Sequence, residues 1–166
     1  MNLKARIQVF IELGEYLKTD IYQDAEDQLS KAEVLNPWFT RENIASAISA
    51  WHEQLKVDML TSWLNPYKIK EVASPKNVLI IMAGNIPLVG FHDFLTVLIS
   101  GHKSVIKMSS TDNVLLRLFI EKIISIAPEL KESISFIDDV RNRKFDGVIA
   151  TGSNNSARYF ESYFQS

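Results

Sequence analysis

The feature that most constrains the fold is an apolar run at residues 78–82, which stops at a turn of sequence Gly-Asn-Ile-Pro at residues 84–87. A short apolar run bounded by a turn is typical of a strand that is buried on both faces, as in a parallel sheet. A second apolar segment, of helical length, follows at residues 88–100. In α/β proteins, a buried strand that leads through such a turn into a helix forms ligand sites at the carboxyl end of the strand. The only polar side chain of the turn, Asn85, is therefore a candidate donor to a substrate oxygen.

Length and charge limit the class of protein. The chain has 166 residues and a net charge of −2, which suits one domain, or a small domain with an appendage, and gives no reason to expect a nucleic-acid partner. No apolar stretch reaches the roughly 18 residues of a membrane-spanning helix, and the amino terminus has no secretory pattern. We therefore expect a cytoplasmic protein. Cysteine is absent, which excludes disulfides, a thiolate nucleophile and cysteine-based zinc sites within these residues.

The first part of the chain, residues 1–66, has a helical pattern. Apolar residues recur at helical spacing over residues 3–17, 22–35 and 44–63, and Asn-Pro pairs stop the last two of these segments. Thr40 is in position to cap the third helix, which we expect to be continuous.

The second part, residues 76–166, alternates between strand-like and helical patterns. Strands are expected at residues 78–82, 104–107, 134–137 and 147–150. Helices are expected at residues 88–100 and 154–164, and a third helix is expected to begin after Asp112, which is in position to cap it. Strands separated by helix-length segments predict parallel βαβ units. The fold class is therefore α/β, with a Rossmann-like parallel sheet and flanking helices, preceded by a helical segment.

Two further strands of the expected sheet also end in small polar residues. Lys107 ends one strand and Ser109 follows it; a lysine ammonium at that edge could hold a ribose hydroxyl or a phosphate. Thr151, Gly152 and Ser153 follow another strand and open the last expected helix, where free N–H groups favour an anion. Three turns of this kind at one edge of a sheet predict a shared ligand site.

Each turn also has a plain structural explanation. The Asn85 amide could bond to the local backbone, Lys107 could be a solvated lysine, and Ser109 or Ser153 could cap a helix. His92 beside Asp93 suggests an acid–base pair, but adjacent helical residues point about 100° apart. Packing or a hydrogen bond at the start of the helix is therefore the favoured role for that pair.

The three turns together resemble the aldehyde dehydrogenase superfamily, and within it most closely the long-chain acyl-CoA reductases of the LuxC type. In that superfamily, the asparagine of a Pro-Trp-Asn-Phe-Pro turn holds the substrate oxyanion, a lysine after the next strand contacts the adenosine ribose, and a Phe-Thr-Gly-Ser turn lies against the cofactor. Asn85, Lys107 and residues 150–153 match these positions. The runs at residues 91–94 and 154–159 resemble the acyl-CoA reductase branch in particular.

The resemblance implies an aldehyde-dehydrogenase-like, partial nucleotide-binding domain at residues 76–166 and a helical segment at residues 1–66. It implies reduction of a fatty acyl thioester such as acyl-CoA to the aldehyde, with NADPH favoured over NADH, through a cysteine acyl-enzyme. Asn85 would be the catalytic residue, and the cofactor-binding residues would be Gly84, Lys107, Ser109, Thr151, Gly152 and Ser153.

The family's nucleophilic cysteine lies in a catalytic domain that follows this region. We therefore expect the chain to be the amino-terminal part of a longer protein that is a homo-oligomer, and to be inactive alone. Two alternatives remain from the sequence: a non-catalytic α/β binding or assembly module, and another aldehyde dehydrogenase relative.

Overall fold

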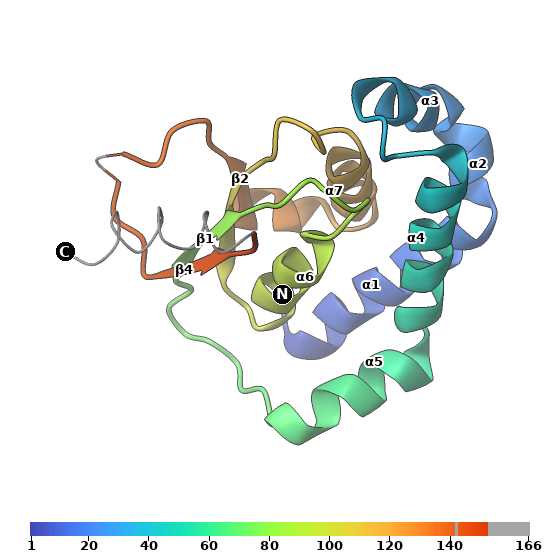
Figure 1. Cartoon of the computed structure of the whole chain (residues 1–166). Helices are drawn as coiled ribbons and strands as arrows, with labels where there is room; N and C mark the ends of the chain where they lie inside the picture. Colours follow the sequence, from blue (N-terminus) through green and yellow to red (C-terminus); the bar gives the residue numbers. More distant parts are fainter. Residues whose placement is uncertain (142, 153–166) are drawn as a thin grey trace.

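A computed structural model describes residues 1–141 and 143–152 as a parallel sheet with helices packed against it (Figure 1). The strands are β1 (Asn77–Ile81), β2 (Lys103–Lys107), β3 (Ile134–Phe136) and β4 (Gly147–Ala150). The α-helices are α1 (Leu3–Lys18), α2 (Asp20–Asp24), α3 (Glu26–Leu35), α4 (Arg41–Gln54), α5 (Val57–Leu64), α6 (Phe91–Ile99) and α7 (Leu115–Ile126). Short 3₁₀ turns occupy Asn65–Tyr67 and Pro128–Ser133.

The four strands pair in the order β3-β2-β1-β4, and each pair is parallel. The predicted α/β class with a parallel sheet is therefore confirmed. The helix expected at residues 154–164 lies outside the described residues.

Strand β1 is buried on both faces, as its apolar run predicts. Ile80 is fully buried in the large core that the helices form, while Leu79 is fully buried in a smaller cluster on the other face, with Ile81 and Val105. The helices α6 and α7 lie between the sheet and an arc formed by α1 to α5 (Figure 1). The helical segment and the sheet thus share one apolar core.

An aromatic cluster fills the centre of that core. Phe91, at the start of α6, is fully buried and makes edge-on contacts with Trp51 at 4.7 Å, Phe119 at 5.0 Å and Phe10 at 6.3 Å between ring centroids. These rings come from α4, α7 and α1. Edge-on pairs of this kind add to the free energy gained from burial. Phe91 therefore links the helical segment to the start of the helix that follows the asparagine turn.

The expectation of one continuous helix through residue 63 is wrong. Helix α4 ends at Gln54 and α5 begins at Val57, because Lys56 between them has an extended backbone. The break turns Leu55 fully into the core. There it lies so close to Gly14 of α1 that a Cβ on Gly14 would come within 2.8 Å of the Leu55 Cβ.

The helix expected at residues 88–100 begins later, at Phe91. Leu88 has a left-handed backbone with φ +60°, which a helix cannot contain and which a bulky residue rarely adopts. Asp112 was expected to cap α7, but Val114 holds the N-cap position and has no side-chain capping bond. The Asp112 carboxyl group accepts the Leu88 N–H at 3.1 Å and a backbone hydrogen bond from Leu115, the first residue of α7, so it helps to hold the strained turn beside the start of that helix.

Truncation of Phe91 tests the shared core. Phe91→Ala should lower the free energy of unfolding by about 3–5 kcal/mol, because it removes a fully buried ring and leaves a cavity. Phe136→Ala is the matched control, since Phe136 is 37% exposed and has its contact with Arg117 near the surface; its cost should be about 1 kcal/mol. Urea denaturation measures both variants, and equal losses would contradict the central role of Phe91.

Candidate functional site

The order of the strands defines where a ligand would bind. From β1 the chain moves to β2 and then β3 on one side, and it then crosses back to β4 on the other side of β1. The direction of the connections reverses between β1 and β4. In open α/β sheets, ligands bind outside the carboxyl ends of the strands at such a switch point. The segments that follow β1 and β4 are therefore the ones expected to border a ligand.

A groove of about 720 Å³ lies at this point, within the range of about 300–1,000 Å³ that is typical of small-molecule sites. The residues that follow three strand ends form much of its wall, together with the corner between α3 and α4. Five of the predicted site residues line it: Gly84, Asn85, Ser109, Thr151 and Gly152.

The other two predicted site residues are Lys107 and Ser153. Lys107 ends β2 at the same edge of the sheet, but it is half-buried and does not line the groove. It pairs in register with Ile81, so its side chain belongs to the sheet face opposite α6 and α7. Ser153 lies outside the described residues.

Asn85 is exposed on the turn after β1. Its side-chain amide makes no hydrogen bond to any other described residue. Among the described residues, the amide therefore does not bond to the local backbone, which was its alternative role. An unpaired amide at the edge of a groove can donate to an oxygen of a bound molecule.

Polar contacts hold the neighbouring Gly84 in place. Its carbonyl accepts the Thr111 hydroxyl at 3.0 Å and the Asn36 side-chain amide at 3.1 Å. A Cβ on Gly84 would lie 2.5 Å from the Thr111 Oγ1 and 2.7 Å from the Ser109 Cβ. The loop after β2 thus packs directly on the asparagine turn, and glycine is required by this close approach.

The turn after β4 is tied to α6. The Thr151 hydroxyl donates to the Asp93 Oδ2 at 2.5 Å, and the Thr151 N–H donates to the Ile81 carbonyl at 3.2 Å. Asp93 lies in the first turn of α6, so this bond is the hydrogen bond near the start of a helix that the sequence favours, while the other carboxylate oxygen, Oδ1, lies 3.8 Å from the His92 Nδ1. Sequence reasoning missed the partner because 58 residues separate the two side chains.

Asp112 is a buried carboxyl group behind the groove, with 6% of its surface exposed. Burial raises the pKa of this carboxyl from 3.8 to about 6, against the opposing effect of backbone hydrogen bonds from Leu88 and Leu115. In the folded chain the neutral form of Asp112 therefore predominates up to about pH 6, and the carboxylate predominates above it.

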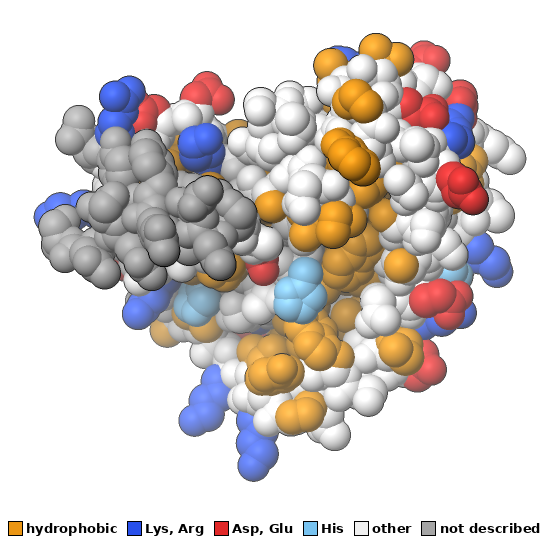
Figure 2. Space-filling model, viewed as in Figure 1, with side chains coloured by type: hydrophobic (Ala, Val, Ile, Leu, Met, Phe, Trp, Pro, Cys, Tyr) orange, Lys and Arg blue, Asp and Glu red, His pale blue; other side chains and the backbone are white. Residues whose placement is uncertain are grey.

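One part of the groove is apolar. Trp38 and Ile86 line it with 76% and 56% of their surfaces exposed. Figure 2 shows apolar side chains gathered in a band down the middle of this face, between the arc of helices and the sheet. The groove thus offers apolar surface beside the Asn85 amide, a combination that is common in small-molecule sites.

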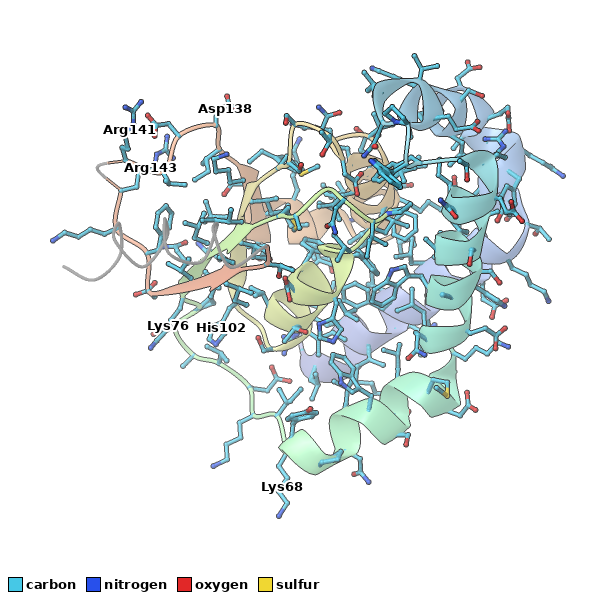
Figure 3. All side chains as sticks on the ribbon, in the orientation of Figure 1. Lys68, Lys76, His102, Asp138, Arg141 and Arg143 are labelled. Atoms are coloured by element: carbon cyan, nitrogen blue, oxygen red, sulfur yellow. The ribbon has the colours of Figure 1, made fainter. Side chains whose placement is uncertain are left out.

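Charged side chains lie elsewhere in the described part of the chain. Lys76 and His102 meet at the amino edge of the sheet, where the Lys76 N–H donates to the His102 Nδ1 at 3.2 Å (Figure 3). Asp138, Arg141 and Arg143 project from the loop after β3 (Figure 3). No Asp, Glu, Lys or Arg lines the groove among the described residues, so neutral donors there would contact a ligand.

Residues 1–141 and 143–152 contain neither a candidate metal site nor a candidate membrane-spanning helix. No three His, Cys, Asp or Glu side chains there gather into a group that could hold a metal ion. Nor does any of their helices have the length and apolarity needed to cross a membrane.

The fold is that of an α/β protein with a parallel sheet, and a groove lies at the switch point of that sheet. A family model described as acyl-CoA reductase (LuxC) matches residues 14–165. The chain therefore belongs to the LuxC acyl-CoA reductase family, as its motifs predict.

Comparisons with curated proteins and with solved structures give no further relative that identifies a family. A search of curated proteins finds no match. Among solved structures, a γ-glutamyl phosphate reductase from Saccharomyces cerevisiae is similar at 16% identity, with a TM-score of 0.41, over 97% of this chain and 53% of that protein. The chain thus spans about half the length of that relative.

Substitution of Gly84 tests the close approach at the groove. Gly84→Ala should lower the free energy of unfolding by about 1–3 kcal/mol, because the loop after β2 must move to admit the methyl group. Gly147→Ala is the control, since nothing lies within 4 Å of a Cβ at Gly147, and its effect should stay within about 0.5 kcal/mol. Urea denaturation compares the two, and a Gly84→Ala chain as stable as the wild type would contradict the packing described.

The pH dependence of stability tests the burial of Asp112. Between about pH 4 and pH 6, the folded chain keeps a proton that the unfolded chain has released, so stability should fall as the pH rises through this window. Relative to Asp112→Asn, which does not titrate, the wild type should lose up to about 3 kcal/mol between pH 4 and pH 7. Urea denaturation at several pH values measures this difference.

Asp139→Asn provides the control for that series. A hydrogen bond from the Arg141 side chain lowers the pKa of Asp139 to about 2, so this exposed carboxylate stays ionised throughout the window. The stability difference between Asp139→Asn and the wild type should therefore be constant from about pH 5 to pH 7, and below pH 5 it should move in the opposite direction to that of Asp112. A constant difference for Asp112→Asn as well would show that burial does not raise the pKa of Asp112.

Proposed function

We propose that this chain is the cofactor-binding part of a reductase that converts a fatty acyl thioester, such as an acyl-CoA, to the aldehyde with NADPH. The observation that carries the proposal is the Asn85 amide, which has no partner among residues 1–141 and 143–152, at the switch-point groove beside the turn of Thr151 and Gly152. Membership of the acyl-CoA reductase family supports the substrate class.

In this proposal, Asn85 donates its side-chain amide to the carbonyl oxygen of the thioester. Attack of a thiolate on the carbonyl carbon places negative charge on that oxygen and expels coenzyme A as its thiolate. A donor fixed at this point stabilises the transition state, and the loss of one such donor typically costs ~10²–10³ in rate. The 166 residues contain no cysteine, so the nucleophile that the family implies would come from outside them.

The groove has features that suit a nicotinamide dinucleotide. Gly152 lets the backbone come close to a ligand, and the hydroxyls of Ser109 and Thr151 can still accept hydrogen bonds there. Lys107 at the end of β2 can donate to ribose hydroxyls at the same edge of the sheet, and Ser153 would add a donor after Gly152. When bound, the cofactor supplies the hydride that reduces the acyl group. NADPH is favoured over NADH by the family resemblance alone.

The proposal extends to the whole protein as a cytoplasmic homo-oligomer. Strands β3 and β4 are the outer strands of the described sheet, and an unpaired strand edge favours pairing with a further strand.

Titration with NADPH tests the proposal. The purified chain should bind NADPH and change its tryptophan fluorescence, because Trp38 lines the groove. Lys107→Ala should weaken binding about tenfold, as expected for the loss of a charged hydrogen-bond donor. Lys103→Ala is the matched control, since Lys103 begins the same strand at the opposite edge of the sheet, and it should bind as the wild type does.

The second candidate function is a non-catalytic α/β module that takes no cofactor. The exposed apolar surface of Trp38 and Ile86 is the observation in its favour. A folded chain with no saturable response to NADPH or NADH would support the module and contradict the reductase. Acyl-CoA reduction by the 166-residue chain alone would also contradict the proposal, since the covalent step needs a thiolate.

A further inference from the structure

Asn36, at the corner between α3 and α4, is a buried polar side chain whose hydrogen-bonding groups are all used. It is 4% exposed. Its amide nitrogen donates to the Gly84 carbonyl at 3.1 Å and to the Thr111 carbonyl at 3.3 Å, and its oxygen accepts the Trp38 N–H at 3.0 Å. Two carbonyl acceptors on one side and an N–H donor on the other fix the orientation of the amide.

These bonds determine how the peptide between Gly84 and Asn85 is oriented. In a trans peptide, the carbonyl of one residue and the N–H of the next point in opposite directions, and no cis peptide occurs among the described residues. Because Asn36 and Thr111 hold the Gly84 carbonyl, the Asn85 N–H points away from them. It makes no hydrogen bond to another described residue and lies on an exposed turn that lines the groove.

We propose that Asn36 is a positioning residue of the groove. By holding the Gly84 carbonyl, it fixes the peptide that carries Asn85, and it leaves the Asn85 backbone N–H as a second donor beside the side-chain amide. This inference rests on the proposed function of the groove. It gives the helical segment a direct part in the site, because Asn36 reaches across 48 residues of sequence to the turn after β1.

Asn36→Asp in the full 166-residue chain tests the inference. The substitution keeps the size of the side chain and its acceptor for the Trp38 N–H, but it replaces the two donated bonds by a carboxylate oxygen that faces two carbonyls. Asn43→Asp is the matched control: the Asn43 amide donates at 2.9 Å to the Trp38 carbonyl at the same corner, and not to the Gly84 turn.

Two readouts separate positioning from general stability. The first is the NMR resonance of the Gly84 carbonyl carbon and of the Asn85 nitrogen, the two atoms of the peptide bond in question. The second is the dissociation constant for NADPH. Asn36→Asp should move both resonances and raise the dissociation constant about tenfold, because the turn that borders the ligand loses its fixed position. Asn43→Asp should leave both readouts unchanged.

Wild-type resonances in Asn36→Asp would overturn the inference. So would altered resonances with an unchanged dissociation constant, since Asn36 would then support the fold alone. If Asn36→Asp does not fold, Thr111→Val decides by the same two readouts, because it removes the other donor to the Gly84 carbonyl from an exposed position. If the wild type binds no NADPH, the proposed function fails, and the resonances still decide whether Asn36 orients the peptide.

Discussion

Strand β1 is paired on both sides, with β2 through Asn77–Ile81 and with β4 through residues 78–81. This double pairing brings the ends of three strands to one edge of the sheet, so that segments more than sixty residues apart in sequence border one groove. It also requires β1 to be apolar on both faces, because α6 and α7 cover one face and the small cluster around Leu79 covers the other. The groove and the buried strand are therefore consequences of the same constraint.

Long-range polar contacts then fix the turns that this pairing brings together. Asn36 holds the Gly84 carbonyl, Asp112 accepts the N–H of the left-handed Leu88, and Asp93 accepts the Thr151 hydroxyl. Buried polar groups are costly unless they are paired, so a network of this kind specifies one arrangement of its members. Each contact joins a turn at the groove to a residue distant in sequence. Such contacts give the turns a fixed geometry, although turns lack the regular backbone bonds of helices and strands.

The sequence predicted much of the sheet and part of the groove. Strand positions agree within a residue at β1 and β2, because apolar runs bounded by polar turns report burial directly. The expected continuous helix through residue 63 failed because Leu55 turns into the core against Gly14, which helical periodicity does not encode. The late start of α6 follows from the left-handed Leu88 and its bond to Asp112, a contact between residues 24 positions apart.

The same limit applies to the candidate site. Its lining residues Asn85 and Gly152 follow strand ends and could be found from the pattern alone. Asn36 and Asp93 could not, because their partners lie 48 and 58 residues away and no local signal marks them. The Asn-Pro pair at residue 36 indicated only the end of a helix.

In the proposed function, a dinucleotide binds at the carboxyl edge of this sheet. Chemical-shift mapping of the isotope-labelled chain with NADPH locates the bound ligand residue by residue. We expect the largest changes in amide resonances at Gly84, Asn85, Thr151 and Gly152, with little change at the amino edge around Lys76 and His102. Changes concentrated at that amino edge, with a quiet groove, would contradict it.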